Sequence, residues 1–163
     1  MIEIKSAETS DDFQTLEDLA TIIWTEHYTP IIGIEQVAYM LDKFQTSEAM
    51  KKQASEGMEY YLLLFNSAPT GYFAVVKKDE SLFLSKLYVQ KEFRGNGLAK
   101  SAMQFIENRE KELGCNSISL TVNKYNIHSI SAYEKMGFVK AKAIVQDIGN
   151  GYIMDDYFME KKN

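Results

Sequence analysis

The chain has 163 residues, of which 45% are hydrophobic and 25% are charged, the proportions of a folded globular protein. The length suits one domain, over residues 1–163, better than two. Eighteen basic residues against 23 acidic ones give a net charge of −5, so the sequence lacks the basic surplus that favours nucleic acid or an anionic membrane surface as a partner.

The first half of the chain predicts a short strand, three helices and three strands. Residues 2–5 alternate apolar and polar side chains like a strand, and residues 10–12 offer capping groups for a helix that runs to about Glu26. Pro30 ends this helix region, because proline disfavours helical backbone in the residue before it. Apolar spacing predicts two further helices, near 37–44 and 47–57, and then three strands joined by short polar turns, 59–65, 72–77 and 82–89.

The second half predicts a glycine-containing loop, a helix to about Leu113, a strand, a helix and a closing hairpin. The later elements fall near 117–122, 126–136, 138–146 and 152–160, and Asn150-Gly151 between the last two is a strong hairpin signal. The order β-α-α-α-β-β-β-α-β-α-β-β predicts an α/β (mixed α+β) fold. We expect a mostly antiparallel seven-stranded sheet flanked by helices, with parallel pairing only where a helix crosses over.

The sequence holds few metal-binding side chains. Cys115 is the single cysteine and His27 and His128 are the two histidines, which excludes an intramolecular disulfide and a cysteine-rich or histidine-rich metal site. No apolar run approaches the roughly 20 residues that span a bilayer, and the N-terminus lacks the layout of a secretory signal. We therefore expect a cytoplasmic protein that has no metal site.

The loop that follows the strand near 82–89 carries the most chemical information. Gly95 and Gly97 allow a tight turn just before a helix, and Arg94 and Lys100 add positive charge on either side. The first N–H groups of a helix have no intrahelical partner and sit at the positive end of its dipole. The segment 94–100 is therefore predicted to bind an anion, and phosphate is the natural one.

Three phosphate-binding patterns can be compared with this loop. The P-loop pattern would need glycines where Arg94 and Ala99 stand, and the dinucleotide pattern would need glycine in place of Lys100. The third pattern, Arg/Gln-x-x-Gly-x-Gly/Ala, is matched by Arg94-Gly95-Asn96-Gly97-Leu98-Ala99. It resembles the coenzyme A pyrophosphate loop of the GNAT acetyltransferase superfamily.

A second segment and the order of the elements strengthen the resemblance. Residues 123–138 are similar to the family's Asn-x-x-Ala-x-x-x-Tyr-x-x-x-Gly-Phe signature, with Asn126, Tyr133 and Gly137 in place, although Ser129 and Ile130 stand where alanine is usual. The hairpin-rich first half, the loop and helix, and the closing hairpin also look like the GNAT layout. The resemblance covers essentially the whole chain.

The resemblance implies that acetyl-CoA is a co-substrate and that an amine attacks its thioester directly. Backbone N–H groups of the loop would hold the pyrophosphate, and the strand that enters the loop would pair with the pantetheine arm, with the Val89 N–H facing the thioester oxygen. Asn126 would hold the cofactor arm. The residues expected to bind the cofactor are Leu87, Tyr88, Val89, Arg94, Gly95, Asn96, Gly97, Leu98, Ala99, Lys100 and Asn126.

Tyr133 is the expected general acid. It lies seven residues after Asn126, two helical turns on, so both side chains face the same side of their helix. A tyrosine with a usual pKa of about 10 is protonated at neutral pH and can protonate a thiolate whose conjugate acid has a pKa of roughly 8.5.

The residues around the amine are less specific. Glu26, His27 and Tyr28 fall in the region that lines the acceptor cleft in similar proteins, and Asp155 and Asp156 lie on the last strand, where only one of two consecutive residues can face a given cleft. No general base stands out, and a water chain is an alternative. The region from Ile23 to Leu41 looks most like the bacterial polyamine or diamine acetyltransferases, so the expected partner is a small-molecule amine, and similar proteins are often homodimers.

Two other functions stay open. A catalytically idle acyl-CoA-binding regulatory module would use the same loop but not Tyr133. A nucleotide-phosphate binder is disfavoured by the two glycine patterns that do not fit.

Overall fold

The computed structural model describes residues 1–162. Its seven strands are β1 (Ile2–Ser6), β2 (Glu59–Phe65), β3 (Ala68–Lys78), β4 (Ser81–Val89), β5 (Ser117–Asn123), β6 (Val139–Gly149) and β7 (Tyr152–Lys162). Its helices are α1 (Ser10–His27), α2 (Thr29–Ile32), α3 (Ile34–Phe44), α4 (Ser47–Ser55), α5 (Leu98–Glu112) and α6 (Ile127–Lys135), with a single 3-10 turn, η1 (Lys91–Phe93), before α5.

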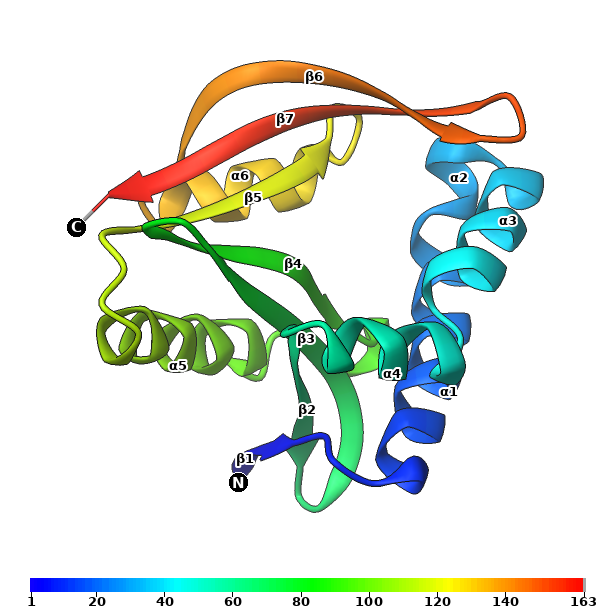
Figure 1. Ribbon diagram of the computed structural model, residues 1–163. Helices are drawn as coiled ribbons and strands as arrows, with labels where there is room; N and C mark the ends of the chain where they lie inside the picture. Colours follow the sequence, from blue (N-terminus) through cyan, green and yellow to red (C-terminus); the bar gives the residue numbers. More distant parts are fainter. Residues whose placement is uncertain (163) are drawn as a thin grey trace.

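The strands form one sheet in the order β1-β2-β3-β4-β5-β7-β6 (Figure 1). All neighbouring strands are antiparallel except β4 and β5, which are parallel and are joined by the crossover helix α5. The mixed seven-stranded sheet and the element order that the sequence predicts are both confirmed. No helix in the described part of the chain is long and apolar enough to cross a membrane.

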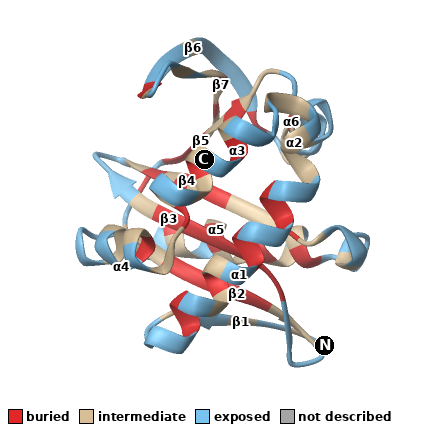
Figure 2. Ribbon diagram, turned by 90° about the vertical axis from the view of Figure 1, so that its right-hand side faces the viewer, coloured by how far each residue is buried: buried red, intermediate tan, exposed pale blue. Residues whose placement is uncertain are grey.

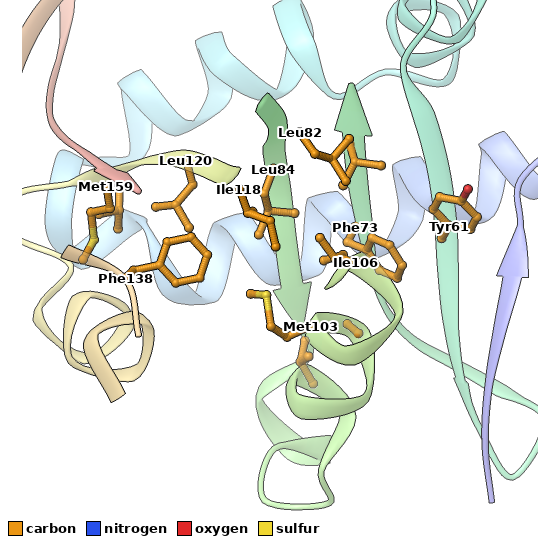
Figure 3. Close-up of a cluster of buried hydrophobic side chains, with 14 of the residues drawn as sticks. Tyr61, Phe73, Leu82, Leu84, Met103, Ile106, Ile118, Leu120, Phe138 and Met159 are labelled. Atoms are coloured by element: carbon orange, nitrogen blue, oxygen red, sulfur yellow. The ribbon is translucent and has the colours of Figure 1, made fainter. Parts of the chain in front are cut away.

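Helices cover both faces of the sheet and give it two cores. Helices α5 and α6 pack on one face, where Met103 and Ile106 of α5 meet Leu84 and Ile118 of the central strands (Figure 3). Helices α1 to α4 cover the other face, with Trp24 and Met40 among the buried side chains there. Figure 2 shows the buried residues along the sheet interior, whereas β6, the edge strand, is exposed along most of its length.

The start of α1 is held by more capping interactions than the sequence alone predicts. Its N-cap is Thr9, one residue before the expected group, and the Thr9 hydroxyl accepts a hydrogen bond from the Asp12 N–H while Asp12 accepts one from the Thr9 N–H. This reciprocal pair is a capping box. Lys5 adds an ion pair to Asp12 at 2.9 Å.

Two larger differences from the predicted elements occur at Pro30 and at the start of β3. An additional short helix, α2, begins at Thr29 with Pro30 in its first turn, a position that suits proline because its missing N–H leaves no hydrogen bond unmade there. Strand β3 begins at Ala68 and not near Tyr72, because Asn66 and Ser67 both adopt positive φ angles and close a two-residue turn.

The feature that positions the site is the separation of β4 from β5. The two strands pair only from Ser81 to Leu84 on β4 and from Ser117 to Leu120 on β5. In the pairing with β3, Ser85 is skipped between Leu84 and Lys86, so β4 carries a bulge at this point. A bulge bends and twists its strand, and beyond it the two strands diverge. The second half of β4 is left without a neighbour on its β5 side.

Candidate active site

A cleft of about 390 Å³ occupies the gap between β4 and β5, within the size range of small-molecule sites. Both strands contribute to its walls, β4 with residues 84–89 and β5 with residues 120–123. Helices α1 to α3 close the cleft on one face of the sheet, and the loop before α5 together with α6 closes it on the other. The cleft therefore passes through the sheet and opens to two different groups of side chains.

The loop end of the cleft is rich in free backbone donors. The N–H groups of residues 95–100 donate no hydrogen bond to any other part of the described chain. Gly97, the N-cap of α5, has a φ of 81° in the left-handed region, which glycine adopts without the penalty that a Cβ brings. Arg94 is fixed by a bond from its Nε to the Val89 carbonyl oxygen at 3.2 Å. Six consecutive free amides at a helix start are able to bind a phosphate group.

Most of the residues predicted for the site line this one cleft. They are His27, Tyr28, Leu87, Tyr88, Val89, Arg94, Gly95, Gly97, Leu98, Ala99, Lys100, Asn126 and Tyr133. Two predicted residues do not line it. Glu26 is exposed beside a separate shallow hollow with Gln90 and Lys91, and the Asn96 side chain turns back to donate to the Phe93 carbonyl oxygen at 2.9 Å.

Asn126 joins α1 to α6 across the cleft. Its Oδ1 lies 3.2 Å from His27 Nε2, and its Nδ2 donates to the Tyr28 hydroxyl at 3.4 Å. The amide is buried, and burial lowers the pKa of His27 while raising the pKa of Tyr28 to about 12. Both rings are therefore neutral at pH 7. The sequence indicates a contact of Asn126 with the cofactor, whereas the structure shows its side chain engaged by α1.

Tyr133 projects from α6 into the cleft and packs edge-on against Phe138, with ring centroids 5.6 Å apart. Burial is the main cause that raises its pKa above the usual value, and the nearby Tyr28 adds to the rise. The phenol is therefore protonated at neutral pH and is able to donate a proton inside the cleft.

A comparison with protein families shows which family the chain belongs to. Residues 16–138 match the profile of the Acetyltransferase (GNAT) family. The chain belongs to this family. GNAT enzymes use acetyl-CoA as co-substrate, and the free amides of residues 95–100 fit its pyrophosphate.

The individual relatives share low sequence identity with this chain. Over 146 residues the chain is 27% identical to a protein named "Uncharacterized N-acetyltransferase YdgE" of Bacillus subtilis (strain 168), covering 76% of this chain and 90% of the relative. The PaiA N-acetyltransferase of Thermoplasma acidophilum, solved with coenzyme A, has 22% identity and a TM-score of 0.82 over 100% of this chain and 99% of its own. A ribosomal-protein-S18-alanine N-acetyltransferase of Escherichia coli has 16% identity and a TM-score of 0.74 over 99% and 94%. At these identities the solved structures support the GNAT fold.

The two consecutive aspartates of β7 face opposite sides of the sheet. Asp155 pairs with Lys124 at 2.5 Å on the α6 side. Asp156 lines the GNAT cleft, together with Met154 two residues earlier. It is 5% exposed, and burial raises the pKa of its carboxyl to about 6. The alternation along the strand allows at most one of the two aspartates to face the cleft, and in the structure Asp156 lines it.

Several cleft residues were not singled out by the sequence. Trp24, Ile32 and Met40 face the cleft from α1, α2 and α3, and their helical spacing indicates only that they are buried. Lys86, to which the sequence gives no role, is buried with its Nζ 2.5 Å from the Tyr60 hydroxyl and 3.2 Å from Gln53 Oε1. The bulge at Ser85 turns Lys86 toward α4, and no local pattern marks that bulge.

Proposed function

We propose that this protein transfers an acetyl group from acetyl-CoA directly to a primary amine of a small molecule, within a ternary complex. The whole chain, residues 1–163, would act as one N-acetyltransferase domain. The observation that carries the proposal is the cleft between β4 and β5, which joins the free amides of residues 95–100 to a separate group of side chains on α1 to α3. Two reactants can thus enter from opposite faces and meet at the middle.

The loop and β4 would hold the cofactor. The N–H groups of residues 95–100 would bind the pyrophosphate, and Arg94 and Lys100 would add charge. The unpaired edge of β4 beyond Ser85 would bond the pantetheine arm as a neighbouring strand would. The Val89 N–H would then face the thioester oxygen, where such a donor stabilises the developing charge by a few kcal/mol.

Tyr133 would act as general acid. The phenol would give its proton to the CoA sulfur as the carbon–sulfur bond breaks, and it is protonated beforehand because burial raises its pKa. The assignment rests on its place in the cleft and on that protonation state.

The acceptor class is the open part of this function. A polyamine, as the sequence resemblance indicates, is one of the amines that the proposal covers, and the names of the structural relatives include both PaiA and a ribosomal-protein-alanine acetyltransferase. A homodimer, which similar proteins favour, also stays a prediction, and sedimentation of the purified chain would check it.

A thiol-release assay tests the proposal. The purified chain is incubated with acetyl-CoA and a panel of primary amines, and free CoA is measured against a control without amine. We expect CoA release that depends on the amine and a mass gain of one acetyl group on that amine. Binding of acetyl-CoA without release for any amine would instead support the idle acyl-CoA-binding module.

A further inference from the structure

The side of the cleft that faces α1 to α4 has its own set of walls, which we call the acceptor pocket. Its lining residues from the core on that face are Ile23, Trp24, Tyr28, Ile32, Met40, Tyr88 and Met154. The Trp24 and Tyr28 rings lie 4.5 Å apart, and Trp24 and Tyr88 are 5.7 Å apart at an angle of 73°. These side chains form a continuous apolar and aromatic surface.

Asp156 supplies the negative charge of this pocket. It shares the face of β7 with Met154, and it lines the same cleft as Tyr28. Among the described residues that line the cleft it is the only carboxylate. Its carboxyl makes no hydrogen bond or ion pair within residues 1–162, since Lys124 is engaged by Asp155 on the opposite face. A carboxylate that is nine-tenths buried and unpaired is costly to keep unless a cation joins it.

The positive groups of the cleft lie elsewhere. Arg94 and Lys100 belong to the amide loop on the α5 side, and His128 belongs to α6. The Lys86 amine is held by Tyr60 and Gln53 beneath α4. His27 faces the pocket but is bonded to Asn126 and is neutral at pH 7, because burial lowers its pKa. The acceptor pocket thus presents one negative charge and no free positive charge to a ligand.

From this arrangement we infer that the acceptor is a primary amine with a single positive charge and an apolar body, whose ammonium group binds Asp156 and whose body lies against Trp24, Tyr28 and Met154. This inference rests on the proposed function. A diamine or polyamine would carry a second ammonium group, for which the pocket holds no second carboxylate and only neutral groups such as Gln36 and the Tyr28 hydroxyl. An amino acid would bring its own carboxylate beside Asp156, with no cation to receive it.

Asp156 would also take up a proton. The carboxylate removes one proton from the ammonium group, and the free amine nitrogen attacks the thioester carbon. As the carbon–nitrogen bond forms and the carbon–sulfur bond breaks, Tyr133 protonates the sulfur, and the second proton lost by the nitrogen restores the phenol. Asp156 then releases its proton to solvent, so that the net products are the amide, CoA and one proton.

Matched pairs of amines test the inference. With saturating acetyl-CoA, kcat/KM is measured for pentylamine against 1,5-diaminopentane, which differ by one ammonium group, and for phenethylamine against phenylalanine, which differ by one carboxylate. We expect pentylamine and phenethylamine each to be favoured at least 30-fold over the other member of its pair. Higher kcat/KM for 1,5-diaminopentane or for spermidine would overturn the inference and leave the acetyltransferase intact.

Asp156→Asn, which keeps the shape of the side chain, tests the role of the charge. We expect kcat/KM for pentylamine to fall at least 100-fold while the affinity for acetyl-CoA, measured by calorimetry, stays within twofold and shows that the variant is folded. Asp79→Asn, an exposed aspartate in the turn between β3 and β4, is the matched control and keeps wild-type kinetics. An Asp156→Asn variant as active as the wild type would refute the role of Asp156. Failure of every amine to release CoA would instead overturn the proposed function, and this inference with it.

Discussion

His27 at the end of α1 and Asn126 at the start of α6 meet with 3.2 Å between Nε2 and Oδ1, although 99 residues separate them in the chain. Because an amide oxygen can only accept, Asn126 Oδ1 accepts the bond and the His27 ring donates its Nε2–H. The bond holds the end of α1 over the cleft and fixes the ring that borders the acceptor pocket. We therefore expect Asn126 to act as a positioning residue for the amine side of the site.

Asn126→Ala is expected to raise the KM for the amine. Losing one such bond costs about 1 kcal/mol, or roughly a fivefold change in KM, whereas the KM for acetyl-CoA should change little. A double-mutant cycle with His27→Ala measures the coupling, and the two effects should not be additive. A rise confined to the KM for acetyl-CoA would restore the sequence-based role of Asn126 as a cofactor ligand.

Tyr133→Phe is expected to lower kcat at least tenfold and to leave the KM for acetyl-CoA nearly unchanged, because the phenol acts only as the carbon–sulfur bond breaks. Tyr125→Phe is the matched control, since Tyr125 lies just before α6 and is 68% exposed. Steady-state kinetics with a fixed amine make the comparison. Equal kcat for the two variants would remove Tyr133 from the mechanism.

Gly97→Ala is expected to weaken acetyl-CoA binding at least tenfold. Gly97 has a φ of +81°, and an alanine Cβ there strains the backbone by roughly 1–2 kcal/mol and turns the free amides away from the pyrophosphate. Gly114→Ala is the control at the other end of α5, because Gly114 also has a positive φ, +70°, and open space around it. Both variants should lose similar stability in thermal unfolding. Calorimetry with acetyl-CoA should separate them, and equal affinities would argue against the amide loop as the pyrophosphate site.

The sequence predicts the local features of this protein well. The Asn150-Gly151 turn, the strand–loop–helix around Gly95 and Gly97, and the phase of the apolar residues in α5 each depend on a few neighbouring residues. These short-range signals are enough to fix the order of elements and the place of the phosphate loop.

The acceptor side of the cleft depends on contacts between distant segments. The bulge at Ser85 decides that Lys86 faces α4, and the pairing of Asp156 with Asn123 decides that Asp156 and not Asp155 faces the cleft. Sheet register sets both orientations, and single-sequence periodicity leaves register open. Glu26 is a different case: neighbouring helix residues point about 100° apart, and Glu26 lies on the exposed side of α1 although it is adjacent to His27.

Asp12→Asn tests how much the capping box of α1 contributes to stability. The N–H of Glu8 is the main cause that holds the pKa of Asp12 well below its usual value, with Thr9 and Lys5 contributing. A carboxyl with a lowered pKa in the folded state stabilises the fold above the unfolded pKa of about 3.9 and loses that effect as the pH falls below it. We expect a loss of about 1–2 kcal/mol at pH 7 in urea unfolding, shrinking toward pH 2. Asp11→Asn, in the same helical turn but exposed, should cost far less.

Lys86 makes the stability of the fold depend on pH in the neutral and basic range. Burial lowers the pKa of its amine to about 7, while the unfolded chain holds the same proton up to about pH 10.4. Between these values the unfolded state binds more protons, so the free energy of unfolding rises with pH. Replacing the side chain in Lys86→Met removes this contribution. The free energy of unfolding of the wild type, minus that of Lys86→Met, should therefore rise by up to about 1.4 kcal/mol per pH unit between pH 7 and 9. The native Lys77 amine donates to the Leu113 carbonyl oxygen at an exposed site, and the control Lys77→Met should show no such slope. Parallel curves for wild type and Lys86→Met would mean that the Lys86 amine stays charged in the fold.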